Sequence, residues 1–394
     1  MILESNLFRS DPERSGEVAK ISAEAKDHRP DHDRNIGIDV LRAVAILIVM
    51  ALHWVNSRLP APATSAWDNV FIRFAGHGTY GVELFFVLSG FLITSAAMAR
   101  EPNLFTMSAR DFYVRRIARI QPLYLAIVVI GFAVVLIGPI GSGIFHYTFR
   151  EPSAAFGGEF VASLFTFSYN WEMIAHRNEF FFRGLHWDVM WSLAVEEQFY
   201  LAFPILILWA RQRRKLILAL LAVVALGAAT RILMDAAHAG FLLKLMNSFS
   251  CFDAIAIGAL CALWIDDWKP GHTLSDLAVA AGVAAIVVAC YRGGVIILLL
   301  GACLFVLGAR STRIFRHRLW RIPARIGQLS YGLYLFQALA LWLAAPVLEG
   351  RHVAAAFLLF VGSALIIAEA SYRYYEVPLN IWTKTMLRRR LAAW

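Results

Sequence analysis

Residues 37–56 read GIDVLRAVAILIVMALHWVN, a run whose charged residues are Asp39 and Arg42 near its start and which carries His53 near its end. Twenty residues of helix extend about 30 Å, which is the thickness of the hydrocarbon core of a bilayer. Similar runs recur along a chain that is 59% hydrophobic and 16% charged, with a mean hydropathy of +0.60. This pattern indicates an integral membrane protein and excludes a single soluble domain, a disordered chain and a disulfide scaffold.

Only helices and closed β-barrels satisfy their own backbone hydrogen bonds within a bilayer. The run from Leu123 to Leu136 lacks the polar alternation of a barrel strand. The sequence therefore predicts an all-α, polytopic membrane protein. We expect ten transmembrane helices, over residues 37–56, 80–99, 120–139, 189–210, 216–234, 245–265, 274–290, 294–309, 327–347 and 353–372.

The net charge of +9 raises the question of nucleic-acid binding, and the positions of the basic residues answer it. With a cytoplasmic N-terminus, 27 Lys and Arg fall in inner segments, nine are assigned to outer segments, and Arg42 alone is assigned to the interior of a span. This asymmetry follows the positive-inside rule, so we expect both termini in the cytoplasm and no nucleic-acid partner.

The predicted spans divide the chain into three parts. Residues 1–35 are polar and we expect a disordered cytoplasmic tail, residues 36–380 form the membrane domain, and residues 381–394 form a basic cytoplasmic tail. Residues 154–169 are apolar but Gly-rich and short, which favours a re-entrant or interfacial segment. The cysteines lack paired spacing, so we interpret them as small core residues and expect no disulfide or metal site; they are Cys251, Cys261, Cys290 and Cys303.

The first span combines a cation and an imidazole on one helix face. Eleven residues separate Arg42 from His53, which is three turns plus about 20° and a rise of about 16 Å. Asp39 precedes Arg42 by three residues and is expected to pair with it. A bland interpretation stays open, in which Arg42 extends to the inner surface and His53 caps the outer end.

The second span places Glu83 about one turn below the outer surface, where we also expect His53. A carboxylate that binds one ring nitrogen makes the other nitrogen a better general base, so a Glu83–His53 pair is predicted. Ser89 and Gly90 are interpreted as small residues for close helix packing.

Two further groups of polar residues are candidates, one at the inner start of the third span and one inside the fourth span. Arg116 and Arg119 share a helix face suited to phosphate, with Arg115 beside them, although positive-inside anchoring also predicts basic residues there. In the fourth span, at least one of Glu196 and Glu197 must face the bundle interior. We interpret both, together with Trp191, as candidate substrate-binding residues.

The order of several motifs is similar to that of a known family. The runs are GVELFFVLSGFL at 81–92, RRIARIQPLY at 115–124, WSLAVEEQFY at 191–200, SYGLYLF at 330–336 and SYRYYEVP at 371–378, together with the Arg–His spacing of the first span. With ten spans over residues 35–380, the chain resembles the acyltransferase-3 family of bacterial membrane O-acyltransferases.

The resemblance implies a multi-pass protein of the bacterial inner membrane that uses cytoplasmic acyl-CoA, with acetyl-CoA as the default, and no metal. The acceptor is expected to be a hydroxyl of a carbohydrate or glycolipid. His53 matches the essential base, and Arg116 and Arg119 match residues near the coenzyme. The sequence departs from the family pattern at position 337, which is a glutamine where family members commonly carry histidine. Some members also carry a soluble hydrolase-like domain after the last helix, and here we expect such a partner to be separate or absent.

These considerations combine into one hypothesis. Arg116, Arg119 and Arg42 hold the phosphates of the coenzyme, and His53, oriented by Glu83, removes the proton of the acceptor hydroxyl. The alternative is a secondary transporter or flippase, since ten spans allow an inverted repeat of five plus five. The Arg, His and Glu positions of the first half have no counterparts in the second half, which disfavours transport.

Overall fold

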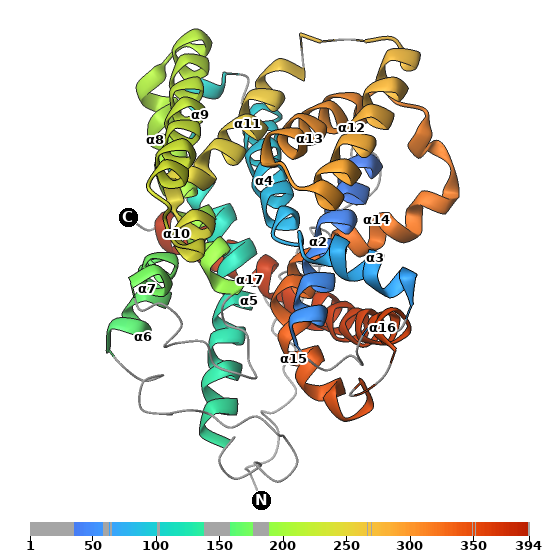
Figure 1. Ribbon diagram of the computed structural model, residues 1–394. Coiled ribbons are helices and arrows are strands. Elements are labelled where there is room, and N and C mark those ends of the chain that lie inside the picture. Colours follow the sequence, from blue (N-terminus) through green and yellow to red (C-terminus); the bar gives the residue numbers. More distant parts are fainter. Residues whose placement is uncertain are drawn as a thin grey trace, which may run out of the picture. The chain divides into compact units, whose positions relative to one another are not determined.

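The computed structural model describes residues 35–57, 63, 65–100, 103–137, 158–175, 189–265, 267–268, 270–348, 350 and 352–392. The predicted tail over residues 1–35 lies almost wholly outside the described residues, and every contact given below belongs to the unit of residues 37–394. In the described part of the chain all regular elements are helices (Figure 1), which confirms the predicted all-α fold.

A helix occupies each of the ten predicted spans. They are α2 (Ile36–Asn56), α4 (Tyr80–Met98), α5 (Ala109–Ile137), α8 (Met190–Ala210), α9 (Arg213–Ala236), α11 (Ser248–Ile265), α12 (His272–Arg292), α13 (Val295–Ala309), α15 (Ser330–Leu348) and α16 (Val353–Ser371). Eight helical segments among the described residues are long and apolar enough to cross a membrane, and α13 is a shorter apolar helix. The multi-pass character is therefore confirmed, while the number of crossings stays a prediction.

Two helices extend beyond their predicted bounds by more than one helical turn. Helix α5 begins at Ala109 rather than at residue 120, because polar residues continue the helix before the apolar run and Pro122 is accommodated inside it. Helix α16 continues through a π-helical turn, Tyr372–Glu376, into α17 (Val377–Ala392). Most of the predicted basic tail is therefore helical.

Short helices connect the long ones. They are α3 (Ala66–Ala75), α6 (Gly158–Phe165), α7 (Tyr169–Ala175), α10 (Phe241–Met246) and α14 (Arg321–Gln328), with 3₁₀ turns at Leu104–Thr106, Ile314–Arg316 and Arg318–Trp320. Helices of seven or eight residues rise only about 12 Å, so neither α6 nor α7 can cross a bilayer. The part of residues 154–169 that the structure describes therefore does not span, and residues 154–157 lie outside the described residues.

Segments predicted to lie on the same side of the membrane meet at the same end of the bundle. At the end that we call inner, Arg213 pairs with Asp267 and holds the pKa of that carboxyl below its usual range, and Arg310 donates to the carbonyl of Ile265 at 3.3 Å.

At the opposite end, which we call outer, Arg73 donates to the carbonyl of Tyr291 at 3.3 Å. In addition, the Gly294 amide donates to the Tyr80 hydroxyl at 2.8 Å. These contacts support the up-and-down order of the helices, and the compartment that each end faces stays a prediction.

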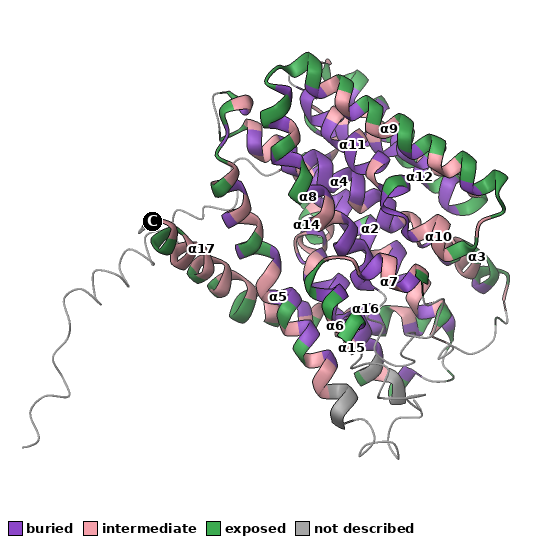
Figure 2. Ribbon diagram, turned by 90° about the vertical axis from the view of Figure 1, so that its left-hand side faces the viewer, coloured by how far each residue is buried: buried purple, intermediate pink, exposed green. Residues whose placement is uncertain are grey.

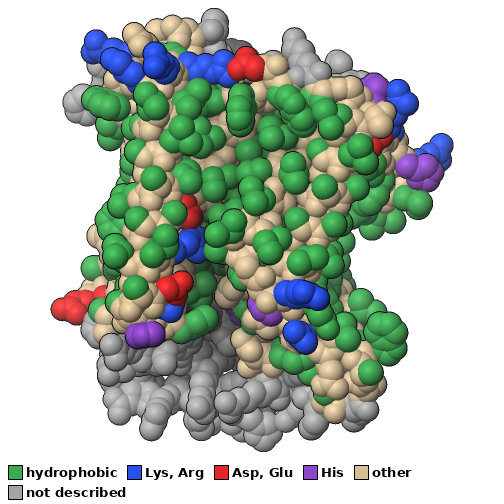
Figure 3. All heavy atoms as spheres, turned by 45° about the horizontal axis from the view of Figure 1, so that its top comes forward, with side chains coloured by type: hydrophobic (Ala, Val, Ile, Leu, Met, Phe, Trp, Pro, Cys, Tyr) green, Lys and Arg blue, Asp and Glu red, His purple; other side chains and the backbone are tan. Residues whose placement is uncertain are grey.

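Helices α2, α4 and α11 form the core of the bundle (Figure 2). Helix α9 lies at the periphery, where large apolar side chains such as Leu226, Ile232 and Leu233 are exposed. A broad hydrophobic face with Lys and Arg gathered along one edge is visible in Figure 3. Such a face is suited to contact with the hydrocarbon chains of lipids.

Glycines bring α4 and α11 into backbone contact. A Cβ atom at Gly90 would overlap the carbonyl of Ile255, and one at Gly258 would overlap the carbonyl of Val87. Only a residue without a side chain allows both approaches, so the predicted packing role of Gly90 is confirmed.

A buried charge cluster joins the peripheral helix α9 to this core. Arg231 of α9 donates to both carboxylate oxygens of Asp253 on α11, at 2.9 and 3.1 Å, and to Glu83 of α4 at 3.0 Å. Asp253 and Glu83 are 3% and 7% exposed. Arg231 falls inside the predicted span 216–234 and inside α9, so the expectation that Arg42 alone lies within a span is wrong, and the outer segments hold eight rather than nine Lys and Arg.

We expect Arg231→Met to destabilise the protein strongly, because two buried carboxylates lose the cation that they share. Breaking a buried pair costs about 3–5 kcal/mol. The measurement is the temperature at which a thiol-reactive dye labels the buried cysteines of the purified protein during heating.

The matched control is Lys244→Met, which removes an ion pair with Asp235 in which the two side chains are 37% and 72% exposed. This change should leave the melting temperature almost unaltered. Removing both carboxylates with Glu83→Gln and Asp253→Asn should restore part of the loss caused by Arg231→Met. Equal melting of Arg231→Met and the wild type would contradict a stabilising role for the cluster.

Candidate functional site

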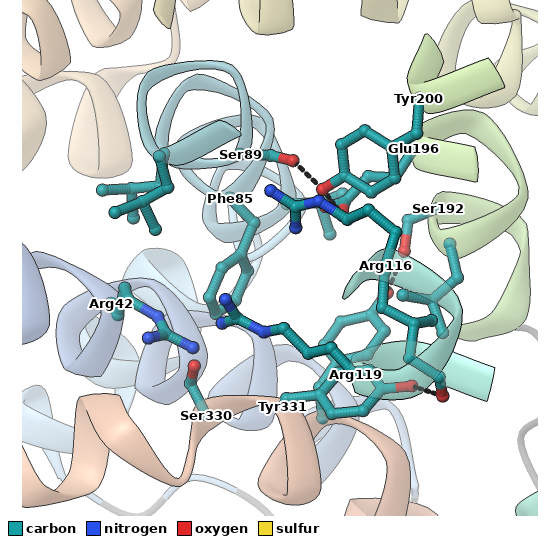
Figure 4. Close-up of a pocket in the computed structure, with 16 residues that line it drawn as sticks. Arg42, Phe85, Ser89, Arg116, Arg119, Ser192, Glu196, Tyr200, Ser330 and Tyr331 are labelled. Atoms are coloured by element: carbon teal, nitrogen blue, oxygen red, sulfur yellow. Dashed lines mark hydrogen bonds between the residues drawn. The ribbon is translucent and has the colours of Figure 1, made fainter. Parts of the chain in front are cut away.

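A pocket opens between five helices in the interior of the bundle (Figure 4). It contains about 790 Å³ of empty space, part of it open to the surroundings. Its lining comes from α2, α4, α5, α8 and α15, and comprises Arg42, Val82, Phe85, Leu88, Ser89, Leu92, Arg116, Arg119, Ile120, Ser192, Leu193, Glu196, Tyr200, Ser330, Tyr331 and Tyr334. Segments that are far apart in the sequence therefore build one site.

Three guanidinium groups face this pocket. Arg42 approaches from α2 on one side, and Arg116 and Arg119 approach from α5 on the other side, with Phe85 between them in the view of Figure 4. The early start of α5 produces this arrangement, because Arg116 and Arg119 lie within its first three turns. The predicted pairing of Arg42 with Asp39 is confirmed, at 3.6 Å.

Three polar side chains of the pocket lining, Glu196, Tyr200 and Ser89, are linked to one another next to Arg116. The Tyr200 hydroxyl donates to Glu196 at 2.8 Å and makes a very short contact with Ser89 Oγ. The guanidinium of Arg116 lies over the ring of Tyr200, 4.7 Å from its centroid. The carboxylate of Glu196 thus lies beside the arginines; its link to Tyr200 follows from their i, i+4 spacing on α8, whereas the sequence gave no indication of the link to Ser89.

Three other candidates lie outside the pocket lining. Trp191 is 6% exposed and packs edge-on against Phe86, with ring centroids 6.1 Å apart. Glu197 has a buried carboxylate oxygen without a hydrogen-bond partner, and Arg115 does not line the pocket. Their roles as substrate or coenzyme ligands remain predictions.

His53 lies outside the pocket lining and contacts α15. Its Nδ1 atom lies 2.9 Å from Oε1 of Gln337, whose Nε2 donates to the carbonyl of Tyr334 at 3.0 Å. Ser330 of α15 shares the pocket with Arg42, and Gln337 follows Ser330 by two helical turns. The predicted common face of Arg42 and His53 therefore packs along one face of α15.

The predicted hydrogen bond between Glu83 and His53 is wrong. Glu83 contacts Arg231, and the axial positions of the helices explain why. Gly81 packs against Ala45 and Val49 of the antiparallel helix α2, so Glu83 and His53 are separated by about 12 Å along the helix axes.

The direction of the Glu83 side chain also differs from the prediction. Glu83 precedes Gly90 by seven residues, which is nearly two full turns, so both share the face of α4 that packs on α11. Val82 and Phe85 point instead into the pocket. The expected depth below a membrane surface therefore gave no information about the partner of Glu83.

Along α15, Tyr334 of the pocket lining precedes by one turn the partner of His53, Gln337. The hydroxyl of Tyr334 lies 2.6 Å from Ser192 Oγ and donates to the carbonyl of Val189 at 3.1 Å. Its ring lies edge-on to that of Phe85, with centroids 6.1 Å apart. Gln337, the partner of His53, is one turn further along α15.

In the described part of the chain no three His, Cys, Asp or Glu residues are grouped to hold a metal ion.

Comparison with known proteins gives three informative relatives. The chain is 29% identical over 383 residues to YrhL of Bacillus subtilis, which is named as a candidate peptidoglycan O-acetyltransferase. The match covers 90% of this chain and 56% of that protein. It is 28% identical over 375 residues to the peptidoglycan O-acetyltransferase OatA of Listeria monocytogenes, with 87% and 55% covered. A candidate O-acetyltransferase of Staphylococcus aureus is 22% identical over 371 residues, with 87% and 57% covered.

The chain therefore spans little more than half the length of these relatives. No solved structure matches it. The family model described as an acyltransferase domain matches residues 35–372, which contain all of the pocket residues and His53. On this match the chain belongs to the acyltransferase-3 family.

Proposed function

We propose that this protein is a membrane O-acyltransferase that moves an acetyl group from acetyl-CoA to a hydroxyl of a carbohydrate acceptor. The observation that carries the proposal is the convergence of Arg42, Arg116 and Arg119 on one pocket, whose far end lies one helical turn from the residue that binds His53. Family membership and the names of the relatives support acetyl transfer, and peptidoglycan is the acceptor that the names of YrhL and OatA suggest.

The charge of the pocket supports a coenzyme with phosphate groups as the donor. Among the described residues, three guanidinium groups and one carboxylate, that of Glu196, are the charged side chains of its lining. Guanidinium groups bind phosphate through paired, charge-assisted hydrogen bonds. We place the phosphates near the inner end, so that their charge stays close to the cytoplasmic surface.

The hydrogen bonds of Gln337 favour His53 as the general base. Since Nε2 of the amide donates to the carbonyl of Tyr334, its Oε1 faces the imidazole and accepts from Nδ1–H. The reverse orientation would place two acceptor oxygens against each other. The basic lone pair of His53 then lies on Nε2, where a general base needs it.

In a direct transfer, Nε2 of His53 takes the proton of the acceptor hydroxyl while the oxygen attacks the thioester carbonyl. The carbon–sulfur bond breaks, and the coenzyme thiolate receives the proton. The thioester has to pass Phe85 and Tyr334 to reach His53, so one of these side chains must move during the cycle. Glu83 takes no part in this scheme, because it is paired with Arg231.

The test uses purified protein in lipid nanodiscs with radiolabelled acetyl-CoA and soluble peptidoglycan fragments. We expect label in the glycan and one free thiol for each acetyl group transferred. A transporter or flippase would move an intact molecule and release no free thiol.

Replacement of His53 by alanine should lower the rate of acetyl transfer by at least about 100-fold, because the general base is lost. Binding of a non-hydrolysable acetyl-CoA analogue should be unchanged, since His53 lies outside the pocket. Turnover near that of the wild type would remove His53 from the mechanism.

Gln337 should act through His53. Gln337→Leu removes the acceptor of Nδ1–H and should reduce kcat with little effect on the KM for acetyl-CoA. Gln337→Glu keeps an acceptor oxygen at that position and should recover most of the activity. Equal losses in the two variants would show that Gln337 does not orient the imidazole.

Arg116→Gln should raise the KM for acetyl-CoA by about 10- to 100-fold, because a charge-assisted hydrogen bond contributes about 1.5–3 kcal/mol. Arg115→Gln is the matched control, since Arg115 lies on the same helix but outside the pocket lining. Steady-state kinetics measure the KM of both variants, and isothermal titration with free coenzyme A checks that the Kd changes in parallel. Equal effects of the two changes would indicate membrane anchoring rather than coenzyme binding.

A further inference from the structure

The end of the pocket nearest to His53 is closed by an aromatic pair, Phe85 and Tyr334. Tyr334 is 6% exposed, and its hydroxyl is held by Ser192 and by the carbonyl of Val189. Phe85 has an apolar ring without such a tether, and it is only partly buried because it faces the pocket. The Tyr334 side of this wall is therefore held in place by hydrogen bonds. On the Phe85 side, the space left for a ligand depends on the size of that one side chain.

The order of the lining residues along three helices defines the direction of the pocket. On α4 the lining runs from Leu92 to Val82, a rise of about 15 Å toward the outer end. On α8 it runs from Tyr200, which contacts Arg116, to Ser192, which contacts Tyr334. Arg116 and the ring of Tyr334 therefore lie toward opposite ends of the same pocket, whereas Arg42 and Arg119 flank Phe85 in the view of Figure 4.

In an acyl-CoA the phosphates and the acyl group are at opposite ends of the molecule. If Arg116, at the inner end, holds the phosphates, the pantetheine arm extends along the pocket past Arg119 and Arg42, and the acyl group meets the wall. Its surroundings there are apolar and include Val82, Leu88 and Leu193. Such a lining suits a short, uncharged alkyl chain.

We propose that Phe85, supported by the tethered ring of Tyr334, determines which acyl groups the enzyme accepts, and that it restricts the donor to short acyl thioesters such as acetyl-CoA. This inference rests on the proposed function and deepens it. An acetyl group passes when the ring of Phe85 rotates, whereas a longer chain needs a wider opening and would also have to break the hydrogen bonds of Tyr334. A discrimination of one or two methylene groups by a pocket wall typically amounts to about 10- to 200-fold.

The experiment compares kcat/KM for acetyl-CoA, butyryl-CoA and hexanoyl-CoA in nanodiscs with the same peptidoglycan fragments. Phe85→Ala should raise the ratio of butyryl to acetyl transfer by at least about 10-fold. The matched control is Leu92→Ala, which removes an apolar side chain of the same helix at the other end of the pocket, and it should leave this ratio within about twofold of that of the wild type.

A second variant guards against a folding defect in Phe85→Ala. Val82→Phe adds bulk at the same end of the pocket and should lower the ratio of butyryl to acetyl transfer. An unchanged ratio in both Phe85→Ala and Val82→Phe would overturn the proposal, as would a shift of equal size in Leu92→Ala. If the wild-type protein transfers acetyl from acetyl-CoA in the same assay, an unchanged ratio contradicts only the role of Phe85 and leaves the proposed function standing. Wild-type protein that transfers no acyl group from any of the thioesters would overturn both.

Discussion

The cost of placing a charge in hydrocarbon governs how this bundle is assembled. An unpaired ionised side chain at the centre of a bilayer costs at least about 2.5 kcal/mol, so buried charges are expected to meet each other or to face a polar cavity. Arg231 pairs with Asp253 and Glu83 together and thereby joins three helices. Charges that face a polar cavity are found in α5, where Arg116 and Arg119 line the pocket. Charge placement thus determines both the packing and the position of the cavity.

The part of the site that follows from helical periodicity was predictable from the sequence. The spacing of Arg42 and His53 placed both on one face, and they do pack along one face of α15. The same reasoning grouped Arg116 with Arg119, which line the pocket together. The long apolar runs located the helices for the same reason, since hydrophobicity and period are properties of the local sequence.

Contacts between helices depend on axial offset and rotation, which local patterns do not contain. Glu83 was matched to His53 by its distance from a membrane surface, whereas the glycine contacts of α4 place it about 12 Å away along the axes. Its true partner, Arg231, was not singled out, because nothing in the sequence separates an arginine near a span end from one in a buried ion pair. The role of Gln337 was likewise hidden, since its partner lies 284 residues away.

Helix α15 connects the two functions that the site has to combine. Ser330 lies in the pocket with Arg42, Tyr334 closes that pocket, and Gln337 binds His53. The amide of Gln337 also donates to the carbonyl of Tyr334, so the wall and the partner of the imidazole share one rigid turn of helix. A movement of this turn that displaced Tyr334 would also shift the oxygen that orients His53. Rotation of the untethered Phe85 ring opens the wall without this effect, which makes Phe85 the side chain that can move while the imidazole keeps its orientation.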